Sequence, residues 1–137
     1  MNLSALLEKA AKTPLIDVEA FYLKAYAYYQ ANQLAEAAEI FGILCARQPM
    51  EKRFWFGLGA SLQESANYEK ARYAWAMAAL LDPENPYPHF HAAECSDALA
   101  RHKDASLALA EAKNRINEPE HPLQGRVALL EEQWRDR

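Results

Sequence analysis

His91, Glu94 and Cys95 have side chains that could do chemistry, and they stand at positions i, i+3 and i+4. On a helix this spacing places them on one face, where they could ligate a metal or form a Cys/His pair. The signal is weak, because cysteine is commonly buried as a small apolar residue and no second ligand cluster follows. A glycine-rich phosphate loop, a G-x-S-x-G elbow and an HExxH motif are also absent from the sequence. We therefore expect no catalytic residue, no metal site and no cofactor.

The composition of the 137 residues narrows the possible partners. Charged residues make up 25% and leave a net charge of −4, so nothing suggests a surface for nucleic acid. No apolar run approaches the ~20 residues that span a bilayer, and residues 1–12 lack a signal-peptide pattern. Cys45 and Cys95 fit neither a metal knuckle nor a disulfide framework. We expect a single cytoplasmic domain with reduced thiols, no nucleic acid partner and no membrane insertion.

Small and bulky residues recur along the chain at a fixed step. Ala37, Ala71 and Ala105 follow one another at intervals of 34 residues, and so do the bulky residues Phe41, Trp75 and Leu109. The middle copy adds the fullest signature, which consists of Trp55, Leu58, Gly59, Ala71, Trp75, Ala78 and Pro83. A step of 34 residues with this pattern is typical of tetratricopeptide repeats, each made of two antiparallel helices. The sequence therefore predicts an all-α fold of three tandem repeats.

The repeat register divides the chain into five segments. We expect an N-terminal helix and linker at 1–17, repeats at 18–51, 52–85 and 86–119, and a C-terminal capping helix at 120–137. The N-terminal pattern consists of Leu3, Leu6, Leu7, Ala10 and Ala11, and it ends at a break at Thr13-Pro14. The C-terminal pattern consists of Leu123, Val127, Leu130 and Trp134. A stack of repeats needs its last apolar face covered, whereas the N-terminal helix could pack on repeat one or contact another copy.

The first helix of repeat one has two apolar stripes. The register assigns Phe21, Ala25 and Tyr28 to the interior of the helix pair, which leaves Tyr22, Tyr26 and Tyr29 on the concave surface. Such a stripe could instead be core. Aromatic residues at related positions of the other repeats favour a binding surface, because contiguous apolar patches commonly mark one. The predicted peptide-binding residues are Tyr22, Tyr26, Tyr29, Phe56, Ala60, Gln63, Tyr87, Phe90 and Glu94. Polar neighbours that could orient an extended ligand are Glu19, Arg53, Glu64 and Asp97.

Two segments resemble a known family, the class II chaperones of bacterial type III secretion. Residues 53–60 read RFWFGLGA and residues 90–95 read FHAAEC, and both runs are similar to those of the family. The resemblance covers roughly residues 21–116. It implies a cytoplasmic protein of a Gram-negative bacterium that keeps secreted translocators, or in some members effectors, soluble before export. It also implies that an extended cargo segment, often with a PxLxxP-like pattern, lies in the concave groove.

Two other functions fit a tetratricopeptide protein. A general adaptor would hold the acidic C-terminus of a heat-shock chaperone through Lys, Arg and Asn, but this chain has Tyr22, Tyr26, Ala60, Phe90 and Glu94 at the corresponding places. A co-regulator of a transcriptional activator remains open, because some members of the family have that partner. A homodimer and the choice between translocator and effector also remain open.

Overall fold

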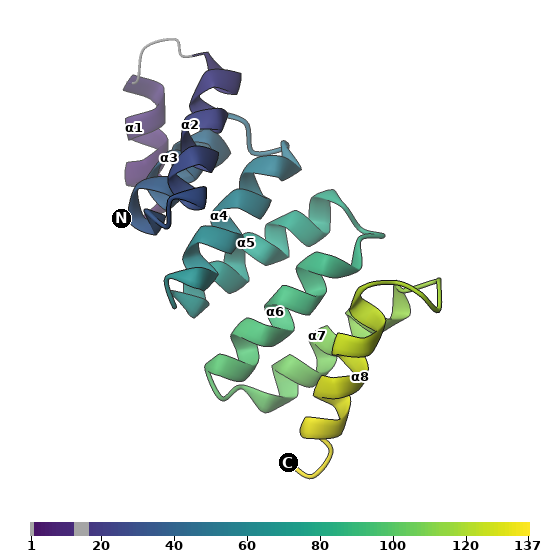
Figure 1. Ribbon diagram of the computed structural model, residues 1–137. Coiled ribbons are helices and arrows are strands. Elements are labelled where there is room, and N and C mark those ends of the chain that lie inside the picture. The colour runs from purple at the N-terminus through teal and green to yellow at the C-terminus, as the bar shows by residue number, and fades with distance from the viewer. Residues whose placement is uncertain (1, 13–16) are drawn as a thin grey trace.

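The computed structural model describes residues 2–12 and 17–137, and within these ranges every regular element is an α-helix. The helices are α1 (Leu3–Lys12), α2 (Val18–Gln30), α3 (Leu34–Arg47), α4 (Lys52–Glu64), α5 (Tyr68–Leu81), α6 (Pro86–Ala98), α7 (His102–Asn114) and α8 (Leu123–Gln133). Figure 1 shows α2 to α7 as a row of helix pairs with α1 and α8 at its ends. The predicted all-α fold is confirmed. None of the described helices has the length and apolarity needed to cross a membrane.

The helix starts repeat at the interval found in the sequence. α2, α4 and α6 begin at Val18, Lys52 and Pro86, and their partners α3, α5 and α7 also begin 34 residues apart. Each helix packs against the next one along the chain from α2 to α7. Asn85 caps α6, because its side chain accepts a hydrogen bond from the backbone N–H of Tyr87. Pro86 follows at the first helical position, where no intrahelical N–H is needed.

The three turns inside the helix pairs share one backbone conformation. Asn32, Ala66 and Ala100 have φ values of 60°, 62° and 58°, which is the left-handed region. In the second pair the N–H of Ala66 donates to the carbonyl of Gln63 and the N–H of Asn67 donates to that of Leu62. The other two turns repeat both bonds, which together form a Schellman motif. The 34-residue step therefore fixes the turns as well as the helices.

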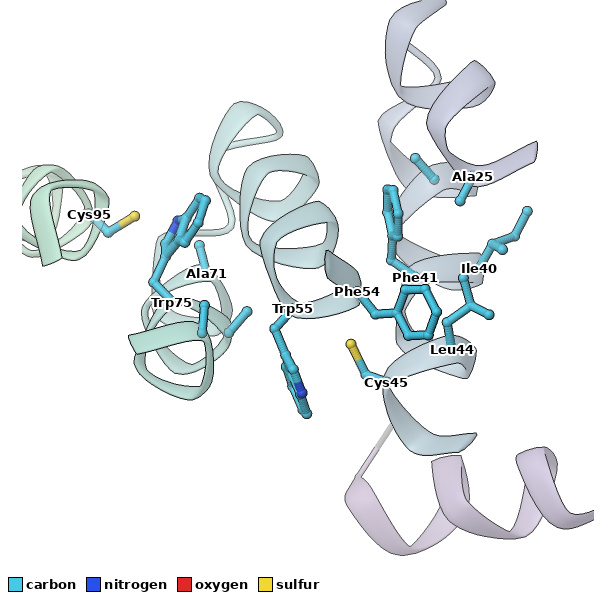
Figure 2. Packing of buried hydrophobic residues seen from close by; sticks show 13 residues of the cluster. Ala25, Ile40, Phe41, Leu44, Cys45, Phe54, Trp55, Ala71, Trp75 and Cys95 are labelled. Carbon is cyan, nitrogen blue, oxygen red and sulfur yellow. The ribbon is translucent and has the colours of Figure 1, made fainter. Parts of the chain in front are cut away.

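Small residues and rings alternate in the core between the helices (Figure 2). Ala25, Ala37 and Ala71 are fully buried where neighbouring helices approach closely, and Trp75 fills the space between the second and third pairs. The buried side chains form two clusters. The larger one extends from α2 to Cys95 on α6, and the smaller one joins α6, α7 and α8.

The terminal helices cover the two ends of the row. α1 packs against α3, with an ion pair of 2.8 Å between Lys9 Nζ and Glu39 Oε1, yet Leu3 and Leu7 remain 60% and 47% exposed. The break predicted at Thr13-Pro14 and the side chains of Ala10 and Ala11 lie outside the described residues. At the other end, α8 buries its apolar face in the smaller cluster, as expected of a capping helix. The buried residues of this face are Leu123, Val127 and Trp134.

Candidate functional site

A groove of about 540 Å³ lies between the first two helix pairs. It is lined by Tyr22, Tyr26, Tyr29, Phe41, Lys52, Arg53, Phe56, Gly57, Ala60, Trp75, Asp82 and Asn85. Five of the residues predicted from the sequence are among them, namely Tyr22, Tyr26, Tyr29, Phe56 and Ala60. The register therefore brings side chains of α2 and α4 to one surface, although they lie about one repeat apart in sequence.

The three tyrosines of α2 form a continuous aromatic wall. Their ring centroids are 6.3 Å apart between Tyr22 and Tyr26 and 6.2 Å apart between Tyr26 and Tyr29. Tyr26 is 45% exposed and Tyr22 and Tyr29 are half-buried, so Tyr26 is the most exposed of the three. Burial and a 2.7 Å hydrogen bond from the Tyr29 hydroxyl to Glu64 Oε1 raise the pKa of Tyr29 to about 12. This hydroxyl therefore stays a neutral donor over the physiological pH range.

Arg53 of α4 holds one edge of the groove. Its guanidinium makes a two-pronged ion pair with Glu19 of α2, with distances of 2.7 Å and 3.2 Å, and a further 3.2 Å bond to Glu51. The same group lies 4.8 Å from the centroid of the Tyr22 ring. The hydrogen bonds from Arg53 lower the pKa of the Glu19 carboxyl. Arg53 thus ties the first repeat to the second and fixes the first ring of the wall.

The groove floor depends on a glycine at position 57. A Cβ added there would lie 2.3 Å from Cε1 of Phe41, so no larger residue fits without moving that ring. Beside it, the rings of Phe56 and Trp75 meet edge to face with centroids 5.5 Å apart. The floor is therefore built from the same rings that join the repeats.

A polar network lies beside the groove on the side of repeat three. Trp75 Nε1 donates to Gln63 Oε1 at 2.8 Å, and Gln63 Nε2 donates to Glu94 Oε1 at 3.1 Å. His91 Nδ1 lies 2.8 Å from the same carboxylate oxygen, and the His91 ring stacks on Trp75 with centroids 4.6 Å apart. Although partial burial opposes ionisation, the bonds from His91 and Gln63 lower the pKa of Glu94. Both ends of the Gln63 amide are used within the protein.

The assignment of Phe90 to the concave groove is wrong. Its side chain is 1% exposed and belongs to the smaller core cluster. The guanidinium of Arg126 on α8 lies 4.6 Å from its ring centroid, so a helix outside the repeats covers it. Tyr87 is half-buried beside the rings of His91 and His121, and neither Tyr87 nor Glu94 lines the cavity. The sequence register placed these residues correctly on α6 but gave no information on what α8 covers.

Of the residues first considered for chemistry, His91 and Glu94 are partly buried and Cys95 is completely buried. Cys95 is fully buried, and this burial raises the pKa of its thiol to about 12, so the thiol does not ionise readily. Burial likewise raises the pKa of Cys45. In the part of the chain that the structure describes, no group of three His, Cys, Asp or Glu residues is arranged to hold a metal ion.

Several groove residues were missed by the sequence reasoning. Lys52 and Asp82 form a 3.3 Å ion pair at the open end of the second helix pair, and Asn85 donates to the same carboxylate at 3.0 Å. The first residue of one helix and the residue after the last of its antiparallel partner are necessarily close. This geometry could have identified the pair from the repeat boundaries alone.

Comparisons with known proteins agree with this architecture. The tetratricopeptide repeat family matches residues 54–85. The type III secretion chaperone SycD of Yersinia enterocolitica, solved with a peptide of the translocator YopD, is 32% identical, with a TM-score of 0.80. The alignment covers 85% of this chain and 91% of SycD. SycD has also been solved as an alternative dimer.

Two further relatives extend the comparison. PcrH of Pseudomonas aeruginosa, solved with the chaperone-binding region of PopD, is 30% identical with a TM-score of 0.82, over 90% of this chain and 96% of PcrH. Low calcium response locus protein H of Yersinia pestis is 35% identical over 78 residues. That match spans 57% of this chain and 46% of the relative. Because its sequence is 32% identical to SycD and 30% identical to PcrH, over 91% and 96% of those chains, this chain belongs to the tetratricopeptide family of type III secretion translocator chaperones.

Proposed function

We propose that this protein is an export chaperone that holds an extended segment of a secreted translocator in the groove between repeats one and two. The observation that carries the proposal is the open aromatic wall of α2, where Tyr26 is 45% exposed beside a cavity of about 540 Å³. Relatives support it, because SycD was solved with a peptide of YopD and PcrH with the chaperone-binding regions of PopD and PopB.

The contacts proposed for the bound segment follow from the side chains of the groove. Tyr22, Tyr26 and Phe56 offer rings on which apolar side chains of the segment are desolvated, and exposed hydroxyls can bond its backbone. Ala60 leaves room for the chain to approach α4. An extended segment loses conformational freedom on binding, and burial against the rings must offset that cost.

Gln63, Tyr87 and Glu94 have a different place in this proposal. The amide of Gln63 and the carboxylate of Glu94 already bond one another, and Tyr87 stands beyond the cavity. We therefore propose that Gln63 and Glu94 position the groove wall instead of bonding cargo. Phe90 has no contact with cargo in this proposal because it is buried.

The proposed role consists of binding alone, so it requires no bond to be made or broken and no nucleotide or metal. We place it in the bacterial cytoplasm, where a translocator must be kept from its partners and from membranes until export. Holding the segment in the groove would cover apolar surface that otherwise promotes aggregation.

Co-purification from the native host, followed by mass spectrometry, tests the proposal directly. We expect a secreted translocator to be recovered with the chaperone. The affinity of the recovered translocator for variants would then identify the surface. Tyr26→Ala should weaken binding about thirtyfold, since truncating an interface anchor costs ~2 kcal/mol.

Tyr73→Ala is the matched control, because Tyr73 is an exposed tyrosine on α5 outside the groove. It should bind like the parent, and both variants should melt near the parent temperature. Equal binding by the parent and the Tyr26→Ala variant would place the cargo on another surface. Recovery of no secreted protein would remove the proposed function.

A further inference from the structure

Residues of α2 and α4 line the groove, whereas the residues at the equivalent positions of α6 do not line it. Along the concave side, the equivalent positions are Tyr22, Phe56 and Phe90; Tyr26, Ala60 and Glu94; and Tyr29, Gln63 and Asp97. On α2 all three residues line the cavity, and on α4 Phe56 and Ala60 do. None of the three on α6 lines it.

The C-terminal segment contacts each of these α6 positions. The Arg126 guanidinium lies 4.6 Å from the Phe90 ring centroid, and its Nη2 is 3.3 Å from Glu94 Oε2. Arg137 donates a hydrogen bond to Asp97 Oδ1. The pattern continues toward the start of α6, where the His121 ring lies 5.7 Å from the ring of Tyr87. Residues 121–137 thus follow the concave side of α6 along its length.

The segment is held there by more than its arginines. Partly exposed ion pairs contribute little by themselves. The apolar face of α8 is buried in the same core cluster as Phe90, through Leu123, Val127 and the ring of Trp134. This burial fixes α8 against the third repeat, and the arginines then set which α6 side chains it covers.

We infer that α8 is the end wall of the groove and that Arg126 and Arg137 determine where a bound segment stops. The cargo is then held by repeats one and two and does not extend along α6. Glu94 and Asp97 already have arginine partners, so the far end of the groove does not select a basic cargo side chain. The inference rests on the proposed function, because it concerns the extent of the same site.

The test maps the footprint of a defined probe, the chaperone-binding region of PopD, on the isotope-labelled protein by NMR. At 15.5 kDa the chain suits this method. We expect intermolecular NOEs to the rings of Tyr22, Tyr26 and Phe56 and none to Tyr87 or Phe90. In the Arg126→Ala variant the guanidinium that lies over one face of the Phe90 ring is removed, and we expect new NOEs to this ring.

Arg135→Ala is the matched control, because Arg135 pairs with Glu132 near the end of α8 and should leave the parent footprint unchanged. NOEs from the probe to Phe90 or Tyr87 in the parent would refute the inference that α8 ends the groove. This measurement does not depend on whether the Arg126→Ala variant folds. An unchanged footprint in a folded Arg126→Ala variant would also overturn the inference. Should the PopD region not bind, the translocator recovered from the native host replaces it, and binding of neither removes the proposed function itself.

Discussion

Replacing Ala66 or Ala100 with glycine should make the protein more stable. Both alanines have the left-handed backbone conformation that glycine adopts most easily. Their φ values are 62° and 58°, and each follows the first helix of its repeat in a Schellman turn. An L-residue in this region is strained by contact between its Cβ and the backbone carbonyl oxygen. Asn32 occupies the same place in repeat one, and asparagine adopts this conformation more readily than alanine.

The size of the effect follows from two opposing contributions. The left-handed conformation costs a non-glycine residue about 1–2 kcal/mol. Glycine has more freedom in the unfolded chain, which offsets about 0.4–1 kcal/mol of the gain. Each substitution should therefore stabilise the fold by ~0.5–1 kcal/mol. The two turns are separate, so the effects should add to ~1–2 kcal/mol, which for 137 residues corresponds to about 3–7 °C in Tm.

Thermal denaturation of the two single variants and the double variant measures this directly. Ala110→Gly is the control, since Ala110 is exposed in the interior of α7 and glycine there should cost about 1 kcal/mol. An alanine-to-glycine substitution is thus expected to raise Tm in the left-handed turns and to lower it inside a helix. Asn32→Gly should change Tm less than either alanine variant. A fall in Tm for Ala66→Gly similar to that of Ala110→Gly would refute the left-handed turn.

Three further predictions concern the groove floor, the inter-repeat core and acid stability. Gly57→Ala should cost about 1–3 kcal/mol in urea unfolding, because the new Cβ would lie 2.3 Å from Phe41 Cε1. At Gly42 an added Cβ meets no atom within 4 Å, so Gly42→Ala should instead stabilise the protein by up to ~1 kcal/mol. Equal changes in unfolding free energy for the two variants would contradict the close contact between Gly57 and Phe41. Trp75→Ala should lower the unfolding free energy by about 3–5 kcal/mol, and an unchanged urea midpoint would show that this ring is not core. The pKa of Glu94 lies below its ordinary value of 4.5, so its stabilising ionisation is present above that value and lost as pH falls through the folded-state pKa. The stability difference between the parent and Glu94→Gln, measured in urea, should therefore narrow from pH 7 to pH 3, and a constant difference would contradict this.

The repeat step made most of the fold predictable from the sequence. Residues at equivalent positions meet equivalent neighbours, so Ala37, Ala71 and Ala105 are all fully buried as their spacing required. The same step separated Ala25, which is buried, from Tyr26, which is exposed, whereas Tyr22 and Tyr29 are partly buried against the core. Periodicity thus carries information about both sides of a helix.

Phe90 shows where that reasoning fails. It stands at the position of Tyr22 and Phe56, and periodicity alone predicts the same environment for all three. Its neighbour Arg126 belongs to a helix outside the repeats, whose position does not follow from the 34-residue step. The partners of the Gln63 amide could not be predicted for a related reason, since Trp75 and Glu94 come from two other helices.

The division of the core into two clusters affects how the protein unfolds locally. A repeat array holds together through contacts between neighbours, so it can unfold from one end while the rest stays folded. Here the boundary between the two clusters passes along α6. Cys95 belongs to the larger cluster, and Phe90 and Ala93 belong to the smaller one. α7 and α8 contribute buried residues only to the smaller cluster, so we expect their backbone amides to exchange with solvent before those of the first two repeats. Unfolding of α7 and α8 would uncover Phe90 while leaving the tyrosine wall of α2 in place.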